Sequence, residues 1–242
     1  MSTPPTPGSL AQVFEAARSM DAPINERLKI IADATRRFSP EYGRAVDDLA
    51  ERLSAANAFE NVPNVGDAMP PFMMPDNRGA LVDLESLTRQ GPAAIVFQRG
   101  SWCPFCRMNT IALSEAYGAA RAAGGNIVAV SPDVRKFTNA LREEFHVPFQ
   151  LLTDIDNGYA MSLGLLIWIG DSLFSMHVRA QRNDVRFQSD AGSMLPVPAT
   201  FIVRSDGTIA ARYIDPDYRK RMEIKDLLGA LDAAAQYGAS PG

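Results

Sequence analysis

The sequence lacks the features that mark several large classes of protein. Its longest strongly apolar stretch, residues 163–169, is far shorter than the about 20 residues needed to cross a bilayer. It also lacks a basic excess, because 24 Lys and Arg residues against 28 Asp and Glu give a net charge of −4. Nucleic-acid binders normally carry a basic patch. We therefore expect neither a membrane nor a nucleic acid as a partner.

Cysteine is scarce, with only two residues, Cys103 and Cys106. Residues 1–8 carry neither the cationic region nor the apolar region of an export signal, so we expect a cytoplasmic protein. Thiols are kept reduced in that compartment. A closely spaced pair of thiols in a reducing environment is the most informative feature of the sequence.

What the sequence does contain is enough apolar material for a core, since 46% of its residues are hydrophobic and 21% are charged. Residues 1–8, rich in proline and small polar residues, predict a disordered tail. Residues 9–58 carry three apolar stripes at helical spacing, which predict a helical N-terminal extension. Residues 62–238 alternate short apolar runs with helical patterns, which is typical of an α/β domain.

Within that domain the turn signals locate two hairpins, at residues 71–83 and 199–213. Apolar runs at 93–98, 126–130 and 149–153 predict strands, and helices are expected at 133–145 and from residue 224. The stretch 163–196 has no assignable pattern. Strands alternating with helices, together with a late antiparallel hairpin, predict a mixed central sheet flanked by helices.

The two cysteines follow directly after a predicted buried strand. The chain leaves that strand, turns through Gly100, and is expected to begin a helix with Cys103 at the N-cap and Pro104 at the first helical position. Free N–H groups and the helix dipole at this place favour a thiolate, so we expect an exposed Cys103 with a lowered pKa. Cys106 lies one helical turn further on, within reach of a disulfide.

Other interpretations of the pair are a zinc site, a structural disulfide and two inert buried thiols. The only histidines, His146 and His177, lie 31 positions apart, which matches no common zinc motif. A disulfide closing so short a loop would stabilise little. The strand–turn–helix context makes inert thiols the weaker interpretation, and we assign neither histidine a catalytic role. Redox chemistry is favoured.

The segment from Gln98 to Cys106, QRGSWCPFC, resembles the cysteine motif of peroxiredoxin-like proteins in the alkyl hydroperoxide reductase/thiol-specific antioxidant family. Residues 65–72 (VGDAMPPF), 76–84 and 196–209 are similar to other motifs of that family, so the resemblance covers about residues 62–235. It implies a thioredoxin-like fold with the redox centre at the two cysteines, and no metal or other cofactor.

Several positions depart from the family pattern. Gly100 and Val96 stand where peroxiredoxins usually have Thr or Ser and Pro, and Pro198 stands where they have an active-site Arg. In thioredoxins a cis-proline faces the cysteine pair from that last place, so the resemblance implies a cis Val197–Pro198 bond. Phe97 replaces the buried carboxylate of thioredoxins.

Four neighbours of the motif are candidate supporting residues. Arg99 and Arg107 could stabilise a thiolate or a peroxide oxygen, or could simply lie in solvent at a strand end and a helix turn. Ser101 is a candidate hydrogen-bond donor and more simply shapes the turn. Trp102 is expected to pack beside the site as a wall that limits access of water.

Three functions remain open. The family resemblance favours a thiol-dependent peroxidase, in which Cys103 attacks a hydroperoxide, Cys106 resolves the product, and thioredoxin or glutathione restores the pair. The departures favour a thiol–disulfide oxidoreductase acting on protein disulfides. The third is a redox sensor whose helical extension recruits a partner. A homodimer is compatible with each of them.

Overall fold

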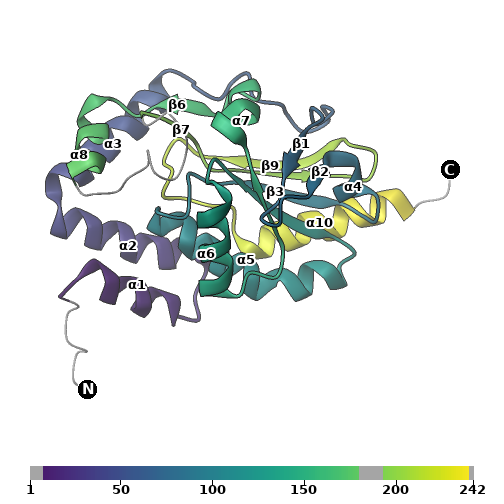
Figure 1. Cartoon of the computed structure of the whole chain (residues 1–242), viewed down its shortest axis with the longest axis horizontal. Helices are drawn as coiled ribbons and strands as arrows, with labels where there is room; N and C mark the ends of the chain where they lie inside the picture. The colour runs from purple at the N-terminus through teal and green to yellow at the C-terminus, as the bar shows by residue number, and fades with distance from the viewer. Residues whose placement is uncertain (1–7, 180–192, 240–242) are drawn as a thin grey trace.

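The computed structural model describes residues 8–179 and 193–239 (Figure 1). The predicted disordered tail, apart from Gly8, lies outside these residues. In chain order the elements are α1 (Leu10–Arg18), α2 (Ile24–Phe38), α3 (Pro40–Ala55), β1 (Met73–Pro75), β2 (Leu81–Asp83), α4 (Leu84–Thr88), β3 (Ala93–Phe97), α5 (Pro104–Ala122), β4 (Asn126–Ser131), α6 (Arg135–Phe145), β5 (Gln150–Thr153), the 3-10 turn η1 (Ile155–Asn157), α7 (Gly158–Ser162), β6 (Leu166–Trp168), α8 (Asp171–Arg179), β7 (Met194–Pro196), β8 (Ala199–Val203), β9 (Ile209–Ile214) and α10 (Ile224–Ala239).

A five-stranded sheet with the order β5-β4-β3-β8-β9 forms the centre of the fold. Strands β3, β4 and β5 are parallel, whereas β8 runs antiparallel to both β3 and β9. The mixed sheet predicted from the alternating pattern is therefore confirmed. Because β3 has a neighbour on each side and both of its faces are covered, all five of its residues are buried, as its continuous apolar run indicates.

Successive side chains of β3 enter different halves of the core. Ala94 and Val96 pack in the cluster that contains the inner faces of α5 and α10, whereas Ile95 and Phe97 pack in the cluster under β1, β2 and α4. Figure 1 shows α5 and α10 along one side of the sheet and the β1–β2 hairpin on the other. The sheet thus lies between two apolar layers.

The helical N-terminal extension covers the outer side of α5. Ser9 is the N-cap of α1, and its side chain accepts a hydrogen bond from the N–H of Gln12 at 3.3 Å. The apolar stripe of α2 is buried against α5, within the same core cluster as the α5 side chains, and α1 and α3 flank α2. Phe38, the last residue of α2, is exposed.

The described part of the stretch that had no assignable pattern, residues 163–179 and 193–196, contains two three-residue strands and a helix. Strands β6 and β7 pair antiparallel and α8 follows β6. Strands this short give no measurable alternation, so sequence periodicity could not locate them. Within the two described ranges, no helix is both long and apolar enough to cross a membrane.

Candidate active site

A sharp turn between β3 and α5 positions both cysteines. Gly100 has a φ of +144°, and a Cβ at this position would lie 2.5 Å from Nε1 of Trp102 and 2.9 Å from Oδ1 of Asp133. Only glycine fits such a turn. Cys103 is the N-cap of α5 and Pro104 the first helical residue, as predicted.

Both cysteines are free thiols and come within 3.6 Å of each other. The expected exposure of Cys103 is wrong, because its exposed fraction is only 1% and that of Cys106 is 0%. The segment between β9 and α10 covers this end of α5. Its Tyr218 packs edge-on against Phe105, and Nη2 of its Arg221 donates to Sγ of Cys106 at 3.3 Å.

The surroundings shift the pKa values of the two thiols in opposite directions. Burial by itself raises the pKa of Cys103, but hydrogen bonds from the Cys106 thiol and backbone N–H, with the charges of Arg99 and Arg221, hold that pKa well below the ordinary value. The pKa of Cys106 is raised well above it, by burial and by the neighbouring Cys103 thiolate. Cys103 is thus the acidified sulfur, as predicted, although it is buried.

Arg99 is one of two buried cations beside the cysteine pair. It is 2% exposed, and its guanidinium lies 3.8 Å from the ring centroid of Tyr218 and 5.0 Å from that of Trp102. Its Nε and Nη1 have no hydrogen-bond partner among the described residues. Buried guanidinium N–H groups are normally satisfied, so this pair of donors is available to an oxygen of a small ligand.

Arg107 does not support the cysteines. Its guanidinium pairs with Glu144 and lies 4.7 Å from the ring centroid of Phe145, on the side of α5 that faces α6. Although Arg107 lies only four residues after Cys103, its guanidinium is directed to α6. Trp102 forms part of the site wall as expected, between Arg99 and the buried His177, to which its ring lies edge-on at 5.3 Å.

Two other supporting residues differ in how they meet expectation. The Val197–Pro198 bond is trans, so the implied cis bond is wrong. The N–H of Val197 donates to the carbonyl of Leu165 at 2.8 Å, which ties this segment to the start of β6. Ser101 shapes the turn, since its backbone N–H donates to Oδ2 of Asp133 at 2.6 Å.

Asp133 is a site residue that sequence reasoning missed. It follows β4, and the parallel pairing of β3 with β4 brings the carboxyl ends of both strands to one edge of the sheet. Its Oδ1 has no hydrogen-bond partner among the described residues. Burial raises the pKa of Asp133 to about 7.

The raised pKa of Asp133 predicts a loss of stability with rising pH. Between about pH 4 and pH 7 the folded protein keeps a proton that the unfolded chain has released, so the free energy of unfolding falls. The fall is on the order of 4 kcal/mol at 1.36 kcal/mol per pKa unit. Asp133→Asn keeps the acceptor for Ser101 and should remove this fall.

Urea unfolding between pH 4.5 and pH 8 measures the effect. The variant should gain stability relative to the parent protein as the pH rises, and the difference should level off above pH 7. Asp48→Asn, at an exposed position on α3, is the matched control and should show a constant difference. A constant difference for Asp133→Asn would show that its carboxyl titrates normally.

A hydrogen-bonded chain behind Arg99 also escaped sequence reasoning. Tyr218 lies under the guanidinium, and its hydroxyl lies 3.1 Å from that of Tyr42 on α3. The same Tyr42 hydroxyl lies 3.1 Å from Nε2 of His177 on α8.

His146, the other histidine, follows the last residue of α6 and has a left-handed conformation. In the described ranges no three His, Cys, Asp or Glu side chains gather as a metal site would require.

A family model described as AhpC/TSA family matches residues 65–212, more than half of the chain. The chain belongs to the AhpC/TSA family. This match begins at the first motif that carried the resemblance and ends within β9.

Curated relatives of this AhpC/TSA chain are named peroxiredoxins. It is 28% identical to the chloroplastic peroxiredoxin Q of Sedum lineare over 92 residues, which are 38% of this chain and 49% of that protein. It is 22% identical to peroxiredoxin bcp1 of Schizosaccharomyces pombe over 163 residues, 65% of this chain and 82% of that protein. The match thus spans about half the length of the first of these relatives.

Solved structures show the same fold. The peroxidoxin BcpB of Mycobacterium tuberculosis has a TM-score of 0.54 at 18% identity, covering 70% of this chain and 96% of that one. A mutant of peroxiredoxin 6 from Arenicola marina has a TM-score of 0.58 at 16% identity, covering 74% and 76%. The predicted thioredoxin-like fold with an N-terminal helical extension is confirmed.

Proposed function

We propose that the protein is a thiol-dependent peroxidase in which Cys103 is the nucleophile and Cys106 the resolving thiol. The observation that carries the proposal is the position of Cys103, a buried sulfur of lowered pKa between the charges of Arg99 and Arg221. Catalysis by a cysteine needs the thiolate, and a lowered pKa favours that form.

The first step oxidises Cys103 and reduces the peroxide. The thiolate attacks the terminal oxygen of a hydroperoxide, the O–O bond breaks with its electron pair going to the leaving alkoxide, and that alkoxide takes a proton from water. Cys103 becomes a sulfenic acid. The two unpartnered donors of Arg99 support this step, since such donors would stabilise the negative charge that develops on oxygen.

The second step forms a disulfide. The Cys106 sulfur attacks the sulfenic acid sulfur, and the hydroxyl leaves as water with the proton of the Cys106 thiol. An approach of 3.6 Å between the cysteines supports this step. One dithiol, or two molecules of a monothiol, then returns two electrons by thiol–disulfide exchange and leaves as a disulfide. We propose thioredoxin or glutathione as donor, the two systems through which a structurally similar 1-Cys peroxiredoxin of yeast mitochondria is resolved.

Burial of the nucleophile favours a small substrate over a protein disulfide. A thiol–disulfide oxidoreductase must bring its leading sulfur against a disulfide on another protein, but Cys103 is 1% exposed. A hydroperoxide needs far less room. The trans bond before Pro198 also departs from the thioredoxin arrangement that the oxidoreductase hypothesis would use.

Consumption of hydroperoxide coupled to NADPH through thioredoxin and its reductase tests the proposal. We expect steady turnover with hydrogen peroxide or cumene hydroperoxide, and the same assay with glutathione and its reductase identifies the donor. Peroxide consumption equal to that of buffer, together with rapid reduction of insulin disulfides, would favour the oxidoreductase. Absence of both activities would favour a redox sensor.

A further inference from the structure

Residues 217–223, in the connection between β9 and α10, contribute two side chains to the redox site. Arg221 donates to Sγ of Cys106, and Tyr218 lies 3.8 Å under the guanidinium of Arg99. This segment has no regular secondary structure of its own. Contacts from elsewhere must therefore hold its conformation. The same contacts keep Arg221 beside Cys106 and Tyr218 against Arg99.

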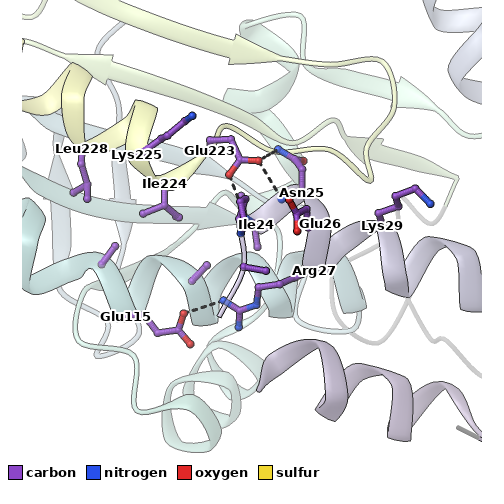
Figure 2. Close-up of a pocket in the computed structure, with 14 residues that line it drawn as sticks. Ile24, Asn25, Glu26, Arg27, Lys29, Glu115, Glu223, Ile224, Lys225 and Leu228 are labelled. Atoms are coloured by element: carbon purple, nitrogen blue, oxygen red, sulfur yellow. Dashed lines mark hydrogen bonds and ion pairs between the residues drawn. The ribbon is translucent and has the colours of Figure 1, made fainter. Parts of the chain in front are cut away.

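The N-terminus of α2 supplies the first of these contacts. The Asn25 side chain accepts from the N–H of Arg221 at 2.9 Å and donates to its carbonyl oxygen at 2.8 Å. The Glu223 carboxylate accepts from the N–H groups of Ile24 and Asn25 at 3.2 and 3.3 Å, and from Nδ2 of Asn25 at 2.7 Å (Figure 2).

The reason for this contact is visible in the sequence of α2. Its N-cap is Pro23, which offers no side-chain acceptor, so the first N–H groups of the helix need partners from outside. Glu223 provides them, and its negative charge suits the positive end of the helix dipole. The same hydrogen bonds therefore cap α2 and hold the end of residues 217–223 in place.

Helix α3 supplies the second contact. The Tyr42 hydroxyl lies 3.1 Å from that of Tyr218, and Asp47 pairs with Arg219 at 2.8 Å. The Arg219 guanidinium also binds Asp217 in the same segment, at 2.7 Å. Two helices of the extension therefore hold both ends of residues 217–223.

The extension is itself fixed to the catalytic helix. Arg27 on α2 is buried and pairs with Glu115 on α5 at 2.9 Å, while its Nε and Nη2 donate to the carbonyls of Ala17 and Arg18 at 3.1 and 3.0 Å. Figure 2 shows Arg27 reaching toward Glu115 on the opposite side of the pocket from Glu223. α2 thus bridges α5 and residues 217–223.

We propose that the N-terminal helical extension is a positioning element of the redox site, with Asn25 and Tyr42 as its positioning residues. They hold residues 217–223 so that Arg221 and the Tyr218–Arg99 pair stay beside the cysteines. Asn25 bonds Arg221 and Tyr42 bonds Tyr218, so both act on the cysteines through another residue. The effect on catalysis rests on the proposed peroxidase function, but the effect on ionisation of Cys103 does not.

The contacts lie where they can be removed without unfolding the protein. Asn25, Arg27 and Glu223 line a pocket of about 810 Å³, and Asn25 is only half-buried. Each hydrogen bond in such a place contributes modestly to stability, on the order of 1 kcal/mol, and the Asn25 side chain makes three of them. Their loss should loosen residues 217–223 more than it destabilises the fold.

Titration of thiolate absorbance at 240 nm tests the proposal on the full chain without any peroxide. Asn25→Ala and Tyr42→Phe should each raise the pKa of Cys103 by about 0.5–1 unit, with Arg221→Leu setting the upper limit. At a pH below the pKa this shift lowers the rate of iodoacetamide alkylation about 3–10-fold. The Cys103→Ser protein provides the blank.

Matched controls separate positioning from general destabilisation. Glu26→Ala changes the exposed neighbour of Asn25. Tyr117 lies toward the end of α5, and Tyr117→Phe removes a hydroxyl that bonds Asn126. Both should leave the pKa of Cys103 unchanged. If Asn25→Ala and Tyr42→Phe lower the melting temperature but leave that pKa where it is, the extension only stabilises the fold and the proposal is wrong. A protein with no peroxidase activity that still shows the two pKa shifts would overturn the proposed function alone.

Discussion

Replacing Cys103 by serine should abolish peroxide turnover, with a loss on the order of 10³-fold or more. A serine hydroxyl is not ionised at neutral pH, so Arg99 and Arg221 have no anion to stabilise and no nucleophile forms. The substitution is nearly isosteric and removes no packing. Coupled NADPH consumption at saturating thioredoxin measures the loss, and the melting temperature checks that the protein is folded.

Cys106→Ser is the matched variant and should behave differently. Its Cys103 thiolate still attacks peroxide, so one equivalent should be consumed in a burst and a sulfenic acid should be trapped by dimedone at Cys103. Steady turnover should then stop, because no resolving thiol is present. A burst in Cys103→Ser but not in Cys106→Ser would reverse the two roles. Steady turnover in Cys103→Ser would refute the nucleophile assignment altogether.

The local geometry of the site could be predicted from the sequence because it depends on neighbours in the chain. An apolar run, a glycine turn and a proline at the first helical position are sufficient to place Cys103 at an N-cap. The same holds for the N-terminal helices, whose apolar stripes repeat at 3.6 residues. Short-range patterns of this kind survive into the structure.

What surrounds the cysteines could not be predicted, because it comes from distant parts of the chain. Arg221 lies 115 positions after Cys106 in a segment with no periodic pattern, so no sequence signal connects the two. Asp133 was closer to prediction. Two adjacent parallel strands end at the same edge of the sheet, and a carboxyl two residues after the second strand would have been a candidate once that pairing was assumed.

Exposure of Cys103 was predicted wrongly for the same reason. A motif defines the backbone around a sulfur but carries no information on which later segment packs over it. Residues 217–223 do so here, and they bring charge with them, so burial and a lowered pKa occur together. A buried sulfur that is kept ionised needs compensating cations, and Arg221 of the distant segment adds its charge to that of Arg99.

Arg99→Leu should reduce the rate constant for reaction with hydroperoxide about 100-fold at pH 7. Part of the loss follows from a higher pKa of Cys103, because Arg99 is the larger of the two charge contributions that lower it. The rest follows from the lost N–H donors facing the peroxide oxygen. Stopped-flow measurement across pH separates the parts, since only the first is recovered at pH 9, where the deficit should shrink to about 10-fold.

Arg107→Leu removes a cation of the same motif that pairs with Glu144 instead, and it should leave the rate unchanged. Arg99→Lys should restore only part of the rate, because a lysine ammonium cannot lie flat on the Tyr218 ring or present two donors in one plane. An equal loss of rate in the two Leu variants would show that general positive charge, and not the placement of Arg99, activates the cysteine.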